Sequence, residues 1–334
     1  MKKILFAAYS LDIGGIEKAL VTLINYLVKE NEYDITLVLE KKEGILLNSI
    51  SNKIKIIEYK PCNCKYKIIR KIKNAYNRFK FIIKHKNKYD YAISYATYSL
   101  PSSFVARTAS RENALWIHSE YLSLFNGDKS KYIEFFNKLN SNSFKSLVFV
   151  SKNSMEIFKE IMKVKDNATQ NIVHINNIID YKNIIKKSNE DIKDLNKSDC
   201  YTFLFVGRQT EEDKKLSRAI EAAKKLKDDK LKFRIILVGQ GRDTNRYKDL
   251  VKKYQLDDYI IFLGEKENPY PYFNISDSLI LTSEYEGFPV VYIEAAVLEL
   301  PIITTNVSDS EIFVKNQYGV VTAKDIDSIY NSMK

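Results

Sequence analysis

Cysteine, histidine and long apolar runs are all scarce in this sequence. Of 334 residues, three are cysteines (Cys62, Cys64 and Cys200) and three are histidines. Three scattered cysteines are too few for a disulfide framework or a four-ligand zinc site, which excludes the disulfide-stapled secreted domains. No apolar run approaches the roughly 20 residues that a membrane-spanning helix needs. We therefore expect a globular protein of the cytoplasm.

Positive charge is concentrated in the first half of the chain. Residues 1–180 hold 29 Lys and Arg against 17 Asp and Glu, whereas the remaining 154 residues hold 24 against 25. Most of the excess lies in residues 53–88, which contain 13 basic side chains and one acidic side chain. Apolar residues recur in that segment at helical spacing, namely Ile68, Ile72, Ala75, Tyr76, Phe79, Ile82 and Ile83.

This pattern predicts a basic amphipathic helix, with two interpretations. Residues 65–88 can lie against an anionic membrane surface, which would make the protein peripheral on the inner membrane face. Alternatively, the apolar stripe packs on the core and the basic face is solvated. Nucleic acid is not an expected partner, because no recognised module or aromatic-stacking motif accompanies the charge.

Short apolar runs alternate with helical patterns along the whole chain, which favours α/β domains with parallel sheets. We expect two Rossmann-like domains facing each other across a cleft, residues 1–180 and 181–334, with the polar segment 181–200 as the boundary. No Gly-x-Gly-x-x-Gly lies at a first strand–helix turn, which excludes a dinucleotide oxidoreductase. The expected strands are Ile4–Ala8, Ile35–Leu39, Ile54–Ile57, Tyr91–Tyr95, Leu115–His118, Leu147–Val150, Phe203–Val206, Phe233–Val238, Ile260–Leu263, Ser278–Leu281, Ile302–Thr305 and Val320–Thr322.

Two carboxylates stand eight residues apart around the start of an expected helix. Glu286 follows the strand Ser278–Leu281, at the strand end where open α/β sheets bind ligands. Pro289 suits the first turn of the helix that comes next, and Glu294 is the only charge in its otherwise apolar first two turns. A carboxylate among apolar residues is costly unless it is hydrogen-bonded, and the vicinal hydroxyls of a ligand would suit it. The alternative is a salt-bridged Glu294 in an ordinary buried helix.

The segment Glu286-Gly-Phe-Pro…Glu294-Ala-Ala…Leu300-Pro-Ile-Ile-Thr-Thr-Asn306 resembles glycosyltransferase family 4. The resemblance implies a retaining, metal-independent enzyme of the GT-B fold that uses a nucleotide sugar, most simply a UDP-sugar, as a substrate and needs no cofactor. It implies that Glu286 faces the donor sugar and Glu294 the ribose. Gly287, Phe288 and Pro289 would bring backbone amides to the sugar hydroxyls. In the family, further helices follow the last strand, whereas only residues 323–334 follow it in this sequence. The carboxyl terminus is therefore expected to be short compared with the family.

The resemblance also gives several positively charged residues and glycines roles in binding the nucleotide sugar. Arg208, after the strand Phe203–Val206, would neutralise the diphosphate together with Lys214, with Lys215 as its substitute. Gly239 and Gly241 would line the base. In the first domain, Gly14 and Gly15 open a loop suited to an anion, and His118 would contact the donor sugar.

The sequence does not suggest a metal site. The only Asp-x-Asp triplet, Asp325-Ile-Asp327, lies in the terminal segment and is expected to cap a short helix. We therefore expect sugar transfer to a hydroxyl of a glycan or lipid-linked glycan, in bacterial surface polysaccharide or capsule synthesis. The alternatives are a non-catalytic GT-B partner subunit of another glycosyltransferase and a nucleotide-sugar epimerase on the same fold.

Overall fold

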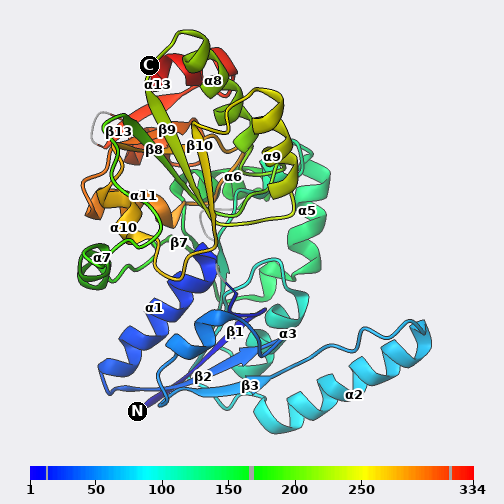
Figure 1. The fold of residues 1–334 in the computed structure, drawn as a ribbon. Coiled ribbons are helices and arrows are strands. Elements are labelled where there is room, and N and C mark those ends of the chain that lie inside the picture. Colours follow the sequence, from blue (N-terminus) through cyan, green and yellow to red (C-terminus); the bar gives the residue numbers. More distant parts are fainter. Residues whose placement is uncertain (13, 165–168, 316–317) are drawn as a thin grey trace. The chain divides into compact units, whose positions relative to one another are not determined.

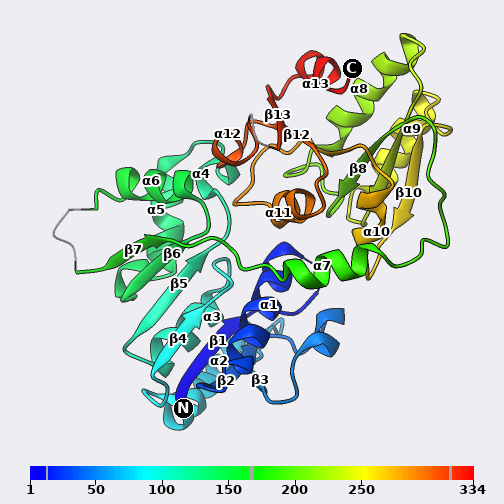
Figure 2. The same cartoon turned by 90° about the vertical axis from the view of Figure 1, so that its left-hand side faces the viewer.

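The computed structural model describes residues 1–12, 14–164, 169–315 and 318–334 (Figure 1). The chain divides into two compact units, Met1–Ile179 and Asp180–Lys334, next to the expected boundary. Each unit is a parallel sheet with helices between its strands (Figures 1 and 2). The predicted α/β class and the two Rossmann-like sheets are thereby confirmed.

The first unit is built on a seven-stranded parallel sheet in the order β3-β2-β1-β4-β5-β6-β7. Its strands are β1 (Lys2–Ala8), β2 (Tyr33–Leu39), β3 (Lys55–Glu58), β4 (Tyr91–Ser94), β5 (Asn113–Ile117), β6 (Ser146–Phe149) and β7 (Asn171–His174). Its helices are α1 (Gly15–Lys29), α2 (Lys67–His85), α3 (Leu100–Ala109), α4 (Tyr121–Leu124), α5 (Lys129–Lys138) and α6 (Lys152–Ile161), with 3-10 turns at Ile45–Ser49 and Ser141–Ser143.

Alternation along β1 explains why this sheet has a core on each face. Ile4, Phe6 and Ala8 join the cluster that contains the buried face of α1. Leu5 and Ala7 join the other, with residues of α3 and α6. Successive side chains of a strand point to opposite faces, so an unbroken apolar strand needs helices on both sides.

The second unit has a six-stranded parallel sheet in the order β10-β9-β8-β11-β12-β13. Its strands are β8 (Tyr201–Val206), β9 (Phe233–Val238), β10 (Ile260–Gly264), β11 (Ser278–Leu281), β12 (Ile302–Thr305) and β13 (Gly319–Thr322). Its helices are α7 (Tyr181–Ser188), α8 (Leu216–Asp228), α9 (Thr244–Lys253), α10 (Tyr270–Asn274), α11 (Val290–Val297), α12 (Ser310–Phe313) and α13 (Ile326–Met333).

Three expectations need correction. Strand β7 was not predicted, and the first eight residues of the expected boundary segment 181–200 form helix α7, which packs against α10 and α11 (Figure 2). Pro289 is the residue before α11, not part of its first turn. The helix is also less buried than its sequence suggested, since only Tyr292, Glu294 and Ala295 are fully buried.

Helix α13 confirms one local prediction. Asp325 precedes it, and its carboxylate accepts a hydrogen bond from the Ser328 amide at 2.8 Å. This is the geometry of an N-cap, which satisfies a backbone donor at the start of a helix. None of the helices that the structure describes is long and apolar enough to cross a membrane.

Candidate functional site

An ion pair lies beyond the carboxyl end of β11, where the loop 282–289 leads into α11. Glu286 Oε1 is 2.5 Å from Lys214 Nζ and accepts a hydrogen bond from Ser283 Oγ at 2.7 Å. The two charged side chains are only 20% and 11% exposed. The fold thus brings together a cation and a carboxylate that the sequence separates by 72 positions. A charged pair in this setting is partly desolvated, so a ligand that carries both charge and hydroxyls can compete for it.

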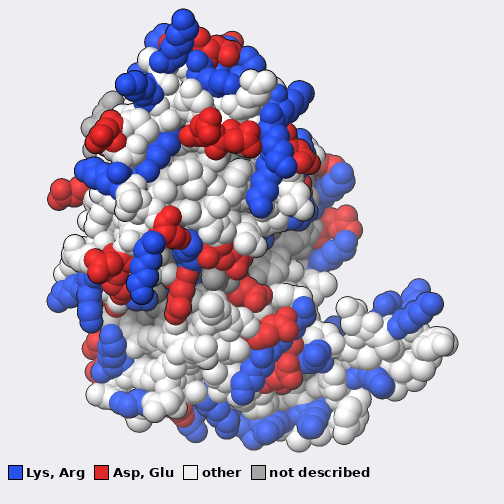
Figure 3. Space-filling model, viewed as in Figure 1, with Lys and Arg blue, Asp and Glu red and all other residues white. Residues whose placement is uncertain are grey.

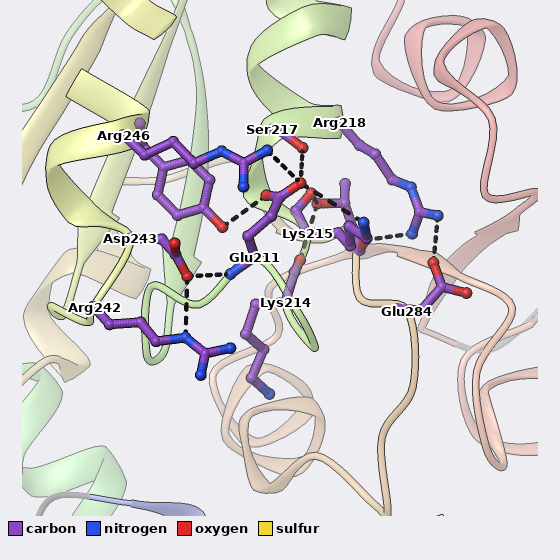
Figure 4. A network of polar contacts seen from close by, with 11 residues as sticks. Glu211, Lys214, Lys215, Ser217, Arg218, Arg242, Asp243, Arg246 and Glu284 are labelled. Carbon is purple, nitrogen blue, oxygen red and sulfur yellow. Dashed lines mark hydrogen bonds and ion pairs between the residues drawn. The ribbon is translucent and has the colours of Figure 1, made fainter. Parts of the chain in front are cut away.

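The structure distinguishes the two lysines that the sequence left as alternatives. Lys215 has a left-handed backbone with φ +46°, and its ammonium lies 3.8 Å from Glu211. Figure 4 shows Lys215 within the Glu211 cluster, whereas the side chain of Lys214 extends away from that cluster. Adjacent residues here point in different directions, and Lys214 is the one that reaches Glu286.

Glu284, which the sequence did not single out, holds the loop in place. Its carboxylate accepts from Arg218 at 2.5 Å (Figure 4). It also accepts from Lys324 at 3.0 Å, and the Glu284 amide donates to the Asp213 carbonyl at 2.7 Å. Burial alone would raise the pKa of Glu284, but the hydrogen bonds from Lys324 and Arg218 outweigh it and lower the pKa below its usual value. Glu284 therefore ties the loop before Glu286 to the segment that carries Lys214.

Glu294 lies in α11 and is only 4% exposed. Its Oε1 accepts a hydrogen bond from the Tyr270 hydroxyl at 3.0 Å, and Tyr270 belongs to the short helix α10. Burial, followed by the charge of Glu294, raises the pKa of Tyr270, so this hydroxyl keeps its proton and remains a donor. Tyr270 stands in the segment Asn268-Pro-Tyr-Pro-Tyr272, and the sequence had given it no role in the site.

Gly239 and Gly241 are required by the crossing of two loops at the ends of β8 and β9. Gly239 has φ +119°, and a Cβ on it would lie 2.1 Å from the Gly207 carbonyl oxygen. A Cβ on Gly241 would lie 2.2 Å from the Gln209 carbonyl oxygen. The buried Gln209 ties the loops together by donating from Nε2 to the Gly239 carbonyl at 2.8 Å. The structure thus gives both glycines a steric reason, and their contact with a base stays a prediction.

The residues between the two carboxylates are fixed by packing. The Gly287 carbonyl accepts a hydrogen bond from the Ser308 hydroxyl. Phe288 is buried with its ring edge-on to Phe313 at 5.2 Å, and the extended backbone of Pro289 precedes α11. In the first turn of α11 the Tyr292 amide donates to the Pro289 carbonyl at 3.1 Å. Backbone amides at a helix start can bind a ligand's oxygens, and their contact with sugar hydroxyls stays a prediction here. Arg208, two residues beyond β8, is exposed.

Three predicted site residues, Gly14, Gly15 and His118, belong to the first unit. Gly14 and Gly15 begin α1, but the Glu17 carboxylate already lies at this helix start, 2.2 Å from where a Gly14 Cβ would be. Ile13 of the same loop lies outside the described residues. A resident carboxylate weakens the case for an anion here.

His118 is buried against Tyr95, with the ring centroids 4.4 Å apart. Neither ring nitrogen has a hydrogen-bond partner among the described residues. Burial lowers the pKa of His118 from 6.5 to about 3, so the imidazole is neutral near pH 7. An unpartnered buried imidazole is costly unless something bonds it, and a ligand hydroxyl would do so.

Across the parts of the chain that the structure describes, no group of three or more His, Cys, Asp and Glu side chains is arranged to hold a metal ion.

Residues 186–333 match the family described as Glycosyl transferases group 1. The match covers nearly all of the second unit, including Arg208, Lys214, Glu286 and Glu294. It supports placing the second unit among the glycosyltransferases, as the resemblance predicted.

Curated relatives match parts of the chain. One is the N-acetylgalactosamine-N,N'-diacetylbacillosaminyl-diphospho-undecaprenol 4-alpha-N-acetylgalactosaminyltransferase of Campylobacter jejuni, 28% identical over 161 residues, which are 47% of this chain and 42% of that protein. Another is the UDP-Gal:alpha-D-GlcNAc-diphosphoundecaprenol alpha-1,3-galactosyltransferase of Escherichia coli, 30% identical over 145 residues, 41% of this chain and 36% of that protein. The matches thus span less than half the length of either relative.

Solved structures match over the whole chain. Anabaena HepE in complex with UDP and glucose has a TM-score of 0.77 at 17% identity, covering 99% of this chain and 88% of that chain. WaaG, a glycosyltransferase involved in lipopolysaccharide biosynthesis, has a TM-score of 0.71 at 15% identity, covering 99% and 89%. At these identities the likeness shows the fold, and that fold is GT-B, as predicted.

Proposed function

We propose that the protein is a retaining glycosyltransferase that moves a sugar from a nucleoside diphosphate, most simply UDP, to a hydroxyl of a glycan or lipid-linked glycan. The observation that carries the proposal is the Lys214–Glu286 pair, partly buried at the carboxyl end of β11 and inside the matched segment 186–333. The relatives from C. jejuni and E. coli, whose names specify diphospho-undecaprenol substrates, support a lipid-linked acceptor in bacterial surface polysaccharide synthesis.

Each charged group then has a role that its surroundings suit. Lys214 and the exposed Arg208 would neutralise the diphosphate as it departs, since fixed cations stabilise charge that grows in the transition state. Glu286 would accept hydrogen bonds from the donor sugar. Glu294, held by Tyr270 through one carboxylate oxygen, would bond the ribose hydroxyls.

Retention of configuration follows if both bonds change on the same face of the sugar. The bond between the anomeric carbon and the phosphate oxygen breaks, and its electron pair leaves with the diphosphate. The acceptor hydroxyl attacks from that face, and its proton passes to the departing phosphate oxygen. Glu286 is bonded to Lys214 and Ser283, which suits an orienting group better than a free nucleophile.

The test is binding followed by transfer. We expect UDP or a UDP-sugar to raise the melting temperature of the wild-type protein, because a ligand that binds only the folded state stabilises it. Lys214→Met should weaken binding roughly 10- to 100-fold, since hydrogen bonds to charged groups contribute about 1.5–3 kcal/mol. Lys215→Met is the matched control and should bind normally.

Donor turnover then separates the alternatives. Release of nucleoside diphosphate that depends on a lipid-linked glycan acceptor, with the product's anomeric configuration retained, supports the proposal. Nucleotide binding without any turnover would favour the non-catalytic partner subunit. Interconversion of the free nucleotide sugar would favour the epimerase. Equal binding by the Lys214 and Lys215 variants would refute the assigned donor site.

A further inference from the structure

Helix α2 (Lys67–His85) has two apolar faces, and its own unit covers only one of them. Phe81 and His85 are buried, with the Phe81 ring 5.3 Å from Tyr59. Six large apolar side chains on the same helix are exposed: Ile68 by 74%, Ile69 by 44%, Ile72 by 63%, Tyr76 by 64%, Phe79 by 61% and Ile83 by 64%. The helix therefore does not simply pack on the core with a solvated basic face, because the face left in solvent is apolar.

These six residues form one continuous stripe. Successive helical residues are rotated by about 100°, and at that spacing the six Cα atoms fall within an arc of about 100° along roughly four turns. Phe81 and His85 lie on the opposite side of the helix. Exposed apolar residues scattered singly are ordinary, but a continuous stripe of this size marks an interaction surface.

The charged side chains that border the stripe are all basic. By the same rotation, Lys73, Lys80 and Lys84 follow one edge and Lys71 the other. Residues 59–89 contain no Asp or Glu. In Figure 3 the arm formed by α2 shows basic atoms in blue among uncoloured atoms, with no acidic atoms in red. An anionic partner with an apolar interior fits both features.

The helix is already formed and anchored before any partner binds. The Asn74 side chain accepts from the Cys62 amide at 2.7 Å and donates to the Cys62 carbonyl at 3.2 Å. Asn77 donates to the Lys60 carbonyl at 3.3 Å. Docking through the stripe therefore carries no cost of folding the helix, unlike the binding of a disordered amphipathic segment.

We propose that α2 docks the protein on anionic lipid bilayers, with the stripe at the boundary of headgroups and acyl chains and the flanking lysines on the lipid phosphates. A bilayer fits better than a second copy of the chain, because pairing two stripes would bring two rows of lysines together. This inference goes beyond the proposed sugar transfer and does not depend on it. If the protein bound vesicles but transferred no sugar, the docking proposal would stand and the proposed glycosyltransferase activity would be refuted.

The experiment is co-sedimentation of the full chain with phosphatidylcholine vesicles, with and without phosphatidylglycerol. We expect binding to the anionic vesicles that weakens with added salt. The double variant Ile72→Ser/Phe79→Ser should bind at least tenfold more weakly. The double variant Lys73→Gln/Lys80→Gln should lose most of the salt dependence. Ile45→Ser, at a site 48% exposed in the same unit, is the control and should bind like the wild type.

A second measurement keeps the result interpretable. Phe79→Trp places a reporter in the stripe, and brominated lipids should quench its fluorescence. Equal binding of the stripe variant, wild-type binding that ignores lipid charge, or an absence of binding would each overturn the proposal. So would self-association, detected by light scattering, that the stripe variant abolishes while vesicles capture nothing. Circular dichroism of each variant establishes that it is folded.

Discussion

His118 makes the stability of the first unit depend on pH. Its pKa is about 3 in the folded protein against an ordinary 6.5, because burial disfavours the charged imidazole. The unfolded chain therefore takes up this proton first as the pH falls. The contribution of His118 to stability is present above pH 6.5 and is lost between pH 6.5 and about 3.

We predict that His118→Phe, which keeps an aromatic ring beside Tyr95, loses stability less steeply on acidification. The difference should approach about 1.4 kcal/mol per pH unit below the unfolded pKa. Urea unfolding at several pH values between neutral and acidic measures it. If the free energy of unfolding changed with pH in the same way in both proteins, His118 would titrate normally in the folded state. An NMR titration of the His118 ring with a midpoint near pH 6.5 would lead to the same conclusion.

Tyr270 supports the burial of Glu294 by donating a hydrogen bond to its carboxylate. Tyr270→Phe removes the hydroxyl that donates to Glu294 at 3.0 Å and leaves that carboxylate oxygen without this donor. We predict that the free energy of unfolding of the second unit falls by about 1–3 kcal/mol. Tyr259→Phe, in the same unit, is the control. In a cycle with Glu294→Gln, strictly additive effects would mean that the two side chains are not coupled.

Sequence reasoning reached one partner of this pair but not the other. The apolar residues around Glu294 in α11 predict that its carboxylate has a hydrogen-bond donor. The donor comes from α10, 24 positions earlier, and only the fold brings it near. The sequence assigned Lys214 to the site but left Lys215 as its substitute, because the left-handed backbone at Lys215 cannot be read from two adjacent lysines.

At the scale of elements, the strand–helix turns after β8 and β9 depend on each other. Gly239→Ala would place a Cβ 2.1 Å from the Gly207 carbonyl oxygen at a φ of +119°. We predict destabilisation of the second unit by more than about 3 kcal/mol, together with weakened nucleotide binding. Gly127→Ala has a φ of +79° with no atom within 4 Å of the new Cβ, and should cost only about 1 kcal/mol.

Differential scanning calorimetry of both variants checks this prediction. Similar losses at the two positions would show that the crossing loops move apart to admit a methyl group. In that case the glycines would be explained by backbone conformation alone.

Most strands were predictable, and one edge strand was missed. The edge strands β3, β10 and β13 lie within one residue of their predicted bounds. Strands β9, β11 and β12 have the predicted bounds. Strands β9 and β11 contain apolar runs of three or more residues, which are typical of strands buried on both faces. Strand β7 has only two apolar residues, Ile172 and Val173, and lies at a sheet edge. Helix α7 is rich in lysine and looked like a linker, but it packs through Ile184.

At the scale of the whole molecule, three apolar cores hold the chain together. Among the described residues, two cores consist of residues from the first unit and one of residues from the second, and none spans residue 180. We predict that a fragment of residues 180–334 folds alone, with cooperative urea unfolding, and binds the same nucleotide as the full chain within about tenfold. Non-cooperative unfolding would show that the second unit depends on the first, and loss of binding by a folded fragment would place essential nucleotide contacts in residues 1–179.

Separate cores also bear on how such a protein changes over generations. A substitution that loosens packing in one half leaves the packing of the other untouched, so variants of the first half can accumulate without eroding the Lys214–Glu286 pair or the Glu294–Tyr270 contact. Recombination near residue 180 would exchange one whole compact unit for another. The partition of the core therefore lets a lineage try new partners for one half while it inherits the chemistry of the other intact.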